Sequence, residues 1–414
     1  MNRYINRIHI NKLFHLNNLD ITIEDENNPH LIITGKNGSG KTILLNAIAD
    51  FLDNVKDDNN LSYLALDERL AAFRKATETT TVASDKLAFR NAALDVSNRI
   101  DKIFGKVSVD FDNPEEVVRK YHIGDFVFAY YQATREIKGI LKEPKSPTKP
   151  SYKKNGKIKE TSTSQFLNFL SDLKIQEALA RNEQQINDAN EISAWFKDFE
   201  HLLQEIFQDD NLKLEFNYKD YSFFIFTNEK KFKFTEVSDG FSAVLDIVAD
   251  LILKMQEDGL LMRNYQKEGV VLIDEIETHL HLGLQKIVMP FLTKTFPNIQ
   301  FIVTTHSPFV LSSMPNAVAY DLEHQQVLED LSNYSYESLA EGYFGVTAES
   351  SDLRLRLNTI KELLEKQELT DGEKSSLKEY IIAFDKIPEA ISPSIIGEYL
   401  QAKIKHSEKI KTIM

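Results

Sequence analysis

The chain has 414 residues and contains no cysteine. This absence excludes disulfide bonds, zinc held by thiolates and catalysis by a thiol, and it is typical of proteins in the reducing cytosol. The sequence also lacks a charged leader followed by an apolar run, and it lacks an apolar stretch of the roughly 20 residues needed to span a bilayer. We therefore expect a cytoplasmic protein with no membrane partner.

An excess of basic charge is also missing. Lys and Arg number 49 against 63 Asp and Glu, which gives a formal net charge of −14. This balance argues against a surface that coats nucleic acid indiscriminately, although a local basic patch remains compatible with it. The length predicts two or three domains or lobes around a sizeable core.

A glycine-rich loop is the clearest motif that is present. Residues 31–52 read LIITGKNGSGKTILLNAIADFL, which predicts a strand, a loop and a helix. The backbone N–H groups of such a loop surround a phosphate at the positive end of the helix, the lysine reaches the β- and γ-phosphates, and the threonine hydroxyl binds Mg²⁺. The residues expected to bind ATP here are Asn37, Gly38, Ser39, Gly40, Lys41 and Thr42, with Thr42 also a ligand of Mg²⁺.

Two later apolar runs end in polar residues suited to phosphate chemistry. Residues 269–273 predict a buried strand that ends in Asp274 and Glu275. One carboxylate can hold Mg²⁺ through its water shell, and the next can polarise an attacking water. Residues 299–303 predict another strand, and His306 follows it where it can donate to a γ-phosphate oxygen.

Two further segments are candidates for the same site. Residues 126–131 (FVFAYY) predict a buried strand before Gln132, whose carboxamide can bind Mg²⁺ or position the water. Ser238 and Gly240 open an apolar helix, where they are either a second phosphate-binding helix start or an ordinary Ser N-cap followed by glycine. The residues alone leave both alternatives open.

The order GKNGSGKT, YYQ, VSDG, VVLIDE and TTHSP resembles the ABC-type ATPases, in the soluble branch of RecF, SMC and OLD proteins. The resemblance implies an α/β fold, a P-loop NTPase of ABC-ATPase head type. In such a head a mixed sheet core is flanked by helices and accompanied by an antiparallel β subdomain. Here an inserted helical lobe and a helical C-terminal tail are expected in addition.

The resemblance also implies roles for single residues and a homodimer or a higher assembly of dimers, in which each copy completes the other's site. The resemblance implies that Lys41 and Thr42 bind phosphate and Mg²⁺, and that Gln132 is the Q-loop glutamine. It implies that Asp274 is the Mg²⁺-side acid, Glu275 the catalytic base and His306 the γ-phosphate sensor. Ser238 and Gly240 would contact ATP that is held by the second copy.

The chain departs from the family pattern in its signature segment. Asp239 and Phe241 replace the usual glycine and glutamine, which puts the rate of turnover in question. The insertion before the signature is far too short for the coiled-coil arms of SMC proteins. After His306 no acidic pattern resembles the nuclease domain of OLD proteins, so we do not expect this chain to cut DNA itself.

Short ATPases with a helical tail after the THSP motif resemble the ATPase subunits of prokaryotic antiphage systems such as Septu and PARIS. This likeness implies a nucleotide-gated switch or scaffold for a separately encoded effector, expected to be a nuclease, in antiviral defence. One alternative is a RecF-like repair or recombination ATPase that binds DNA directly. Another is a scaffold that holds ATP without hydrolysing it.

The sequence alone leaves two interpretations open for several further segments. The lysine-rich loop Lys138–Lys159 is a solvated linker or a basic finger for nucleic acid, and Phe14 or His15 packs in the turn or lies against adenine. His279 and His281 have the spacing of metal ligands, without a further ligand cluster. Helices are expected in the tail, one of them opened by a capping box at Thr370–Glu373, and they either cap the core or dock a partner.

We divide the chain into six segments. They are the β-hairpin and P-loop part of the core at 1–52, an inserted helical lobe at 53–125, the core strand with the Q-loop at 126–137, a basic loop and helical lobe at 138–211, the signature, Walker B, D-loop and His-switch part at 212–325, and the helical tail at 326–414.

Overall fold

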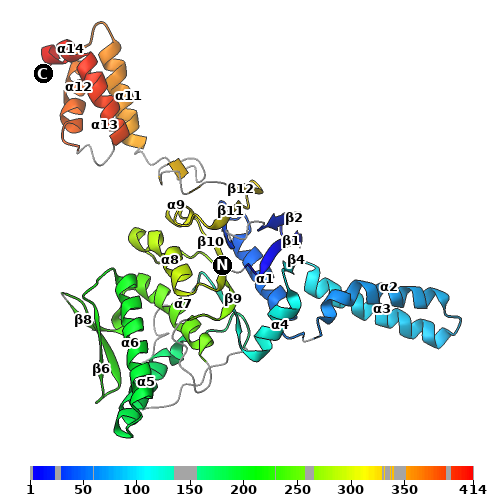
Figure 1. The fold of residues 1–414 in the computed structure, drawn as a ribbon. Helices are drawn as coiled ribbons and strands as arrows, with labels where there is room; N and C mark the ends of the chain where they lie inside the picture. The colour runs from blue at the N-terminus through cyan, green and yellow to red at the C-terminus, as the bar shows by residue number, and fades with distance from the viewer. Residues whose placement is uncertain are drawn as a thin grey trace. The chain divides into compact units, whose positions relative to one another are not determined.

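The computed structural model describes residues 3–23, 29–58, 60–134, 156–228, 230–256, 265–328, 331, 336, 338–339, 351–387 and 393–413. The chain divides into two compact units, Met1–Tyr334 and Ser335–Met414 (Figure 1). In the described part of the chain, no helix is both long enough and apolar enough to cross a membrane.

A six-stranded sheet forms the centre of the first unit. Its strand order is β12-β11-β3-β10-β9-β5, and every neighbouring pair is parallel except β11 with β12. The strands are β3 (His30–Thr34), β5 (Phe126–Tyr131), β9 (Glu268–Ile273), β10 (Ile299–Thr304), β11 (Ala317–Asp321) and β12 (Gln326–Leu328). Because the parallel strands end at the same edge, the residues that follow them gather there.

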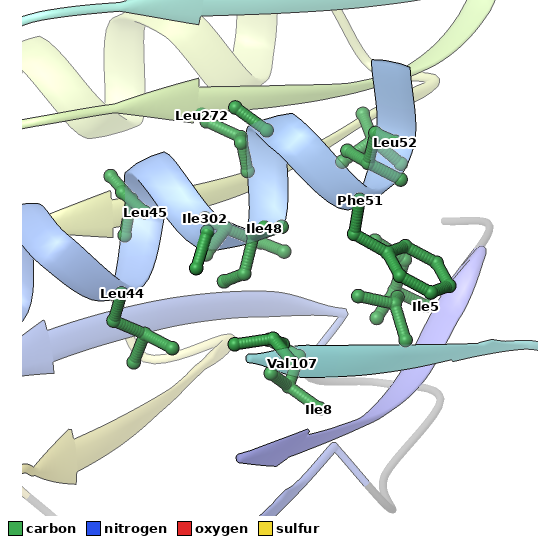
Figure 2. Close-up of a cluster of buried hydrophobic side chains, with 14 of the residues drawn as sticks. Ile5, Ile8, Leu44, Leu45, Ile48, Phe51, Leu52, Val107, Leu272 and Ile302 are labelled. Atoms are coloured by element: carbon green, nitrogen blue, oxygen red, sulfur yellow. The ribbon is translucent and has the colours of Figure 1, made fainter. Parts of the chain in front are cut away.

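A second sheet and one helix complete the core next to it. The antiparallel strands β2 (Leu16–Thr22), β1 (Ile5–Leu13) and β4 (Val107–Phe111) form this sheet in that order. Helix α1 (Lys41–Val55) lies between the two sheets (Figure 2). The figure shows the α1 side chains that face Ile5, Ile8 and Val107 on one side and Leu272 and Ile302 on the other; they are Leu44, Leu45, Ile48, Phe51 and Leu52.

The remaining elements of the first unit are helices and a small sheet. The helices are α2 (Leu66–Thr79), α3 (Ala83–Phe104), α4 (Pro114–Ile123), α5 (Phe166–Asn182), α6 (Ile186–Phe207), α7 (Asp239–Met255), α8 (Leu282–Thr295) and α9 (Pro308–Leu311). The small antiparallel sheet consists of β6 (Lys213–Asn217), β7 (Ser222–Phe226) and β8 (Lys231–Lys233). Trp195 of α6 is fully buried and stacks on Phe199, with ring centroids 5.4 Å apart.

The second unit is a helical bundle with its own apolar core. Its described helices are α11 (Ser351–Glu365), α12 (Asp371–Phe384), α13 (Pro393–Lys405) and α14 (Ser407–Ile413). Leu357, Leu377 and Ile395, from three different helices, are completely buried in this core. The predicted capping box is present, since the Thr370 hydroxyl accepts from Glu373 N and the Glu373 carboxylate accepts from Thr370 N.

The structure confirms the predicted α/β class, with its mixed sheet flanked by helices, its antiparallel subdomain and its helical tail. The helical interpretation of 53–125 was wrong in one place, because β4 at Val107–Phe111 pairs with β1. Five residues are too few for a clear periodic signal, and the partner strand lies about a hundred residues earlier in the chain. The six-segment division remains a prediction, although the β11–β12 hairpin places part of 326–414 on the core sheet.

Candidate nucleotide-binding site

The glycine loop has the backbone shape expected of a phosphate cradle. Gly35, Gly38 and Gly40 have φ angles of +135°, +87° and +102°, which side-chain-bearing residues rarely adopt. Helix α1 then begins without a side-chain N-cap and without an acidic residue in its first turn. Its first N–H groups and its positive dipole end are therefore directed at the loop, where they suit an anion.

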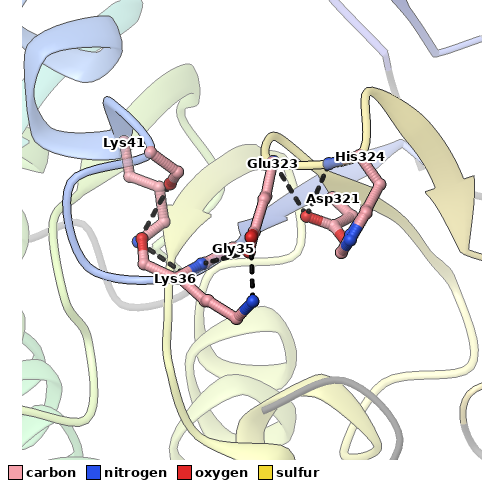
Figure 3. Close-up of polar contacts among 7 residues, drawn as sticks. Gly35, Lys36, Lys41, Asp321, Glu323 and His324 are labelled. Atoms are coloured by element: carbon pink, nitrogen blue, oxygen red, sulfur yellow. Dashed lines mark hydrogen bonds and ion pairs between the residues drawn. The ribbon is translucent and has the colours of Figure 1, made fainter. Parts of the chain in front are cut away.

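The ammonium group of Lys41 lies inside this loop. It donates to Gly35 O at 2.7 Å, to Lys36 O at 3.0 Å and to Ser39 Oγ at 3.3 Å (Figure 3). Burial lowers the pKa of Lys41, and nearby carboxylates including Glu275 and Asp274 oppose that shift. The loop thus holds a partly desolvated cation, and a phosphate that entered the cradle would meet a positive charge already in position.

A contact that the sequence did not reveal ties the loop to the end of β11. Glu323 accepts from the Lys36 ammonium at 3.0 Å and from Lys36 N at 3.3 Å, and Figure 3 shows it beside the loop. Glu323 is itself placed by its own backbone N–H, which donates to Asp321 Oδ1 at 2.9 Å. The available signal was the pair Asp321 and Glu323 at the end of an apolar strand, which differs from Asp274 and Glu275 in having a leucine between the two acids.

The two predicted carboxylates follow β9 beside the end of β10. Asp274 is buried, and its Oδ1 accepts from Thr304 Oγ1 at 2.6 Å. The same Thr304 oxygen accepts from Glu275 N at 2.8 Å. Glu275 has a φ of +44°, a left-handed conformation that is uncommon outside glycine. The Thr304 hydroxyl therefore contacts both Asp274 and Glu275. These contacts and the left-handed backbone fix the position of the Glu275 Cα and the direction of its side chain.

His306 lies within electrostatic range of the same groups. Burial lowers its pKa and Lys41 lowers it further, while Glu275 and Asp274 act in the opposite direction. A lowered pKa favours the neutral imidazole, in which one ring nitrogen carries a hydrogen that can be donated. The structure brings together Lys41, Asp274, Glu275 and His306, as the sequence predicted.

Gln132 follows β5 at the same edge of the sheet. The register pairs Tyr131 with Ile273, and Asp274 N donates to Tyr131 O at 2.8 Å, so Gln132 and Asp274 follow paired positions on neighbouring strands. Gln132 is exposed. This position suits a side chain that contacts a bound ligand at the surface of the sheet edge.

These residues fit Mg²⁺ and ATP by their chemistry. Gly38 leaves room for phosphate, since a Cβ added there would meet nothing within 4 Å. The exposed Thr42 hydroxyl, the Gln132 carboxamide and a carboxylate of Asp274 are oxygen donors of the kind that Mg²⁺ prefers. The Asp274 carboxylate accepts from Thr304 through its Oδ1 atom.

The predicted signature residues have two different environments. Ser238 is exposed at the start of α7, and its side chain makes no capping hydrogen bond. Gly240 is buried, and a Cβ there would lie 2.8 Å from His279 O. The next residue, Phe241, stacks on Phe207 with ring centroids 4.3 Å apart. Gly240 therefore has a packing reason to be glycine, and its contact with a second copy's ATP remains a prediction.

Other candidate residues can now be located. Phe14 is 74% exposed, and the neighbouring His15 ring lies 3.8 Å from the position that a Gly40 Cβ would take. The contact of either ring with adenine remains a prediction. His281 serves as the N-cap of α8, where its Nδ1 accepts from Leu284 N. In the lysine-rich segment, Lys159 pairs with Asp50 at 2.9 Å, and residues 138–155 lie outside the described residues.

The chain is similar to several known proteins. A family model described as "AAA domain, putative AbiEii toxin, Type IV TA system" matches residues 74–312, more than half of the chain. Septu protein PtuA of Bacillus mycoides (strain KBAB4) is 24% identical over 390 residues, covering 91% of this chain and 50% of that protein. "Retron Vc95 probable ATPase" of Vibrio cholerae serotype O1 biovar El Tor is 24% identical over 344 residues, covering 68% of this chain and 66% of that protein.

Among solved structures, an SMC head bound to the C-winged helix domain of ScpA aligns with a TM-score of 0.40 at 14% identity, over 78% of this chain and 97% of that chain. The present chain spans about half the length of PtuA. The relatives confirm the predicted resemblance to ATPases of antiphage systems. On the family match over residues 74–312, the chain belongs to the AAA-domain family whose description names the AbiEii toxin and type IV toxin–antitoxin systems.

Proposed function

We propose that this protein binds ATP with Mg²⁺ in the glycine loop and hydrolyses it. One observation carries the proposal: the Lys41 ammonium lies within the loop and within electrostatic range of Asp274, Glu275 and His306. A cation for the phosphates, carboxylates for metal and water, and a neutral imidazole are the groups that an in-line attack on a γ-phosphate needs. Thr42, Asp274 and Gln132 would hold Mg²⁺, and the bound ion would neutralise phosphate charge.

The chain's own residues divide the work in this proposal. The loop N–H groups and Lys41 bind and orient the triphosphate, Glu275 accepts a proton from the attacking water, and His306 donates to a γ-phosphate oxygen. Ser238 and Gly240 of a second copy close over the nucleotide. The exposure of Ser238 and the lack of a side-chain cap on α7 support this last role, because an uncapped helix N-terminus suits phosphate.

We further propose that the nucleotide state gates a separate effector, expected to be a nuclease, in antiviral defence. The names of the relatives support this level of the proposal: one is a Septu protein, and another is called a probable ATPase of a retron. The DNA-binding alternative depends on the lysine-rich loop, whose residues 138–155 lie outside the described residues.

A Lys41→Ala variant tests the ATPase proposal. We expect ATP affinity to fall at least 100-fold, because several charge-assisted hydrogen bonds to phosphate are lost together. Circular dichroism would check that the variant is folded under the assay conditions. Unchanged ATP affinity in the folded variant would refute the assignment of the loop. Normal binding by the wild-type protein without phosphate release would instead support the non-hydrolysing scaffold.

A further inference from the structure

The carboxylate of Glu277 bridges the segments that follow β9 and β10. Its Oε2 accepts from Thr305 Oγ1 at 2.7 Å, and its Oε1 accepts from the backbone N–H of His306 at 2.5 Å. Both oxygens of the Glu277 carboxylate therefore accept hydrogen bonds, one from the Thr305 side chain and one from the His306 backbone. Glu277 is partly buried, and this burial raises its pKa.

Neighbouring contacts hold the segment after β10 against the segment after β9 and against α8. Ile276 N donates to Thr304 O at 3.1 Å, and Ser307 Oγ donates to Gln285 Oε1 at 2.7 Å. The Thr305 hydroxyl that donates to Glu277 also accepts from Ser307 N at 3.0 Å. Each of the residues 304–307 thus takes part in a hydrogen bond, and the bond to the His306 backbone is the one that Glu277 accepts.

We propose that Glu277 is a positioning residue for the proposed ATPase reaction: its carboxylate fixes the backbone of His306 and so the place of the imidazole relative to the γ-phosphate. The inference rests on the proposed function for its catalytic consequence. General-base action is assigned to Glu275, because both oxygens of Glu277 already accept hydrogen bonds from the protein.

Two substitutions separate positioning from a direct role in the chemistry. Glu277→Ala removes both acceptors, and we expect kcat for phosphate release to fall about 10- to 100-fold while the Kd for ATP stays within about threefold. Glu277→Gln keeps one oxygen that can accept from His306 N, so kcat should stay within about fivefold of wild type. A Gln variant as inactive as the Ala variant would show that the charge itself is needed and would overturn the positioning role.

Amide hydrogen exchange on the full chain without nucleotide gives a readout that does not depend on turnover. We expect Glu277→Ala to increase exchange at His306 by about 10-fold or more, and Glu277→Gln to increase it far less. Unchanged exchange in the Ala variant would overturn the inference even if the wild type proved to be no ATPase. If the wild type releases no phosphate while exchange responds as expected, the proposed function fails and the structural role of Glu277 stands.

Controls address general damage to the fold. Thr305→Val removes the hydrogen bond that the hydroxyl donates to Glu277 and the one that it accepts from Ser307 N, and it leaves the bond from His306 N to Glu277. We therefore expect its effect on His306 to lie between those of the Gln and Ala variants. Glu205→Ala breaks an exposed pair with Lys294 on the same unit and should change neither readout. Thermal unfolding of each variant shows whether the chain is folded under the assay conditions.

Discussion

The Tyr131 hydroxyl donates a hydrogen bond to Asp250 Oδ2 at 2.7 Å. This contact joins the strand that leads to Gln132 with α7, the helix that begins after Ser238. Asp250 is completely buried, and it also accepts from Ser162 N at 2.6 Å and from the Lys254 ammonium. The Lys254 ammonium donates in turn to Glu160 O at 3.0 Å. A buried charge pair of this kind is tolerated because its oxygens and protons have partners.

Removing the cation should therefore be strongly destabilising. We expect Lys254→Met to lower the free energy of unfolding by about 3–5 kcal/mol, because it leaves the Asp250 carboxylate buried without its counter-charge. Urea unfolding followed by circular dichroism measures the change. Arg181→Met is the matched control, since the exposed Arg181 side chain forms an i,i+4 pair with Glu177 and its loss should cost about 1 kcal/mol or less. Equal losses for the two variants would contradict this account of the pair.

Gly240→Ala tests the close packing of α7 against the segment after β9. The added Cβ would lie 2.8 Å from His279 O, a backbone atom, so the segment must move or the helix must shift. We expect a loss of about 1–3 kcal/mol in unfolding free energy and a lower rate of phosphate release.

The control for this substitution is another helical glycine with free space around it. A Cβ at Gly397 of α13 would meet nothing within 4 Å, so Gly397→Ala should stabilise the chain by up to about 1 kcal/mol. If both substitutions stabilise the protein, the contact between Gly240 and His279 does not constrain the backbone as inferred.

The capping box of α12 predicts a pH dependence. The Lys366 ammonium, together with the N–H and hydroxyl of Thr370, lowers the pKa of Glu373 to about 2. Because this folded-state pKa lies below the ordinary value of 4.5, the stabilisation is fully present above about pH 4.5 and is lost as the pH falls toward 2. Glu373→Gln should remove that part of the dependence. Hydrogen exchange at residues 371–384, corrected for intrinsic rates, measures it between pH 2.5 and 5.

A control on the same helix shows whether the effect belongs to the capping box. Glu379→Gln removes one carboxylate of α12 and leaves Thr370 and Glu373 in place. Exchange at 371–384 should keep its wild-type pH profile in this variant. A flat wild-type profile would contradict the assigned role of Glu373.

Much of the site could be predicted because its parts are local. The glycine loop, the carboxylate pair after residue 273 and His306 each follow a short apolar strand, and parallel pairing brings such strand ends to one edge. The clamp between Lys36 and Glu323 was missed, because 287 residues separate its partners and only Lys36 belongs to a motif, the glycine loop.

Two other features depend on tertiary contacts that a local pattern does not contain. Strand β4 is stabilised by pairing with β1, and nothing in its five residues specifies that partner. Gly240 was interpreted from its place in the signature as a ligand contact, whereas its surroundings reveal a packing constraint from His279. The signature motif singled out Gly240, and the fold shows that close packing against His279 is an additional reason for a glycine at this position.

The central claim is that the glycine loop of one copy holds ATP and that Ser238 of a second copy completes this ATP-binding site. The most direct test is the mass of the Glu275→Gln variant, measured by sedimentation with and without ATP and Mg²⁺. We predict that ATP doubles the mass of the assembling unit and that adding Ser238→Arg to this variant abolishes the doubling while the loop still binds ATP. An unchanged mass with ATP bound, or a doubling that persists with Ser238→Arg, would contradict the claim.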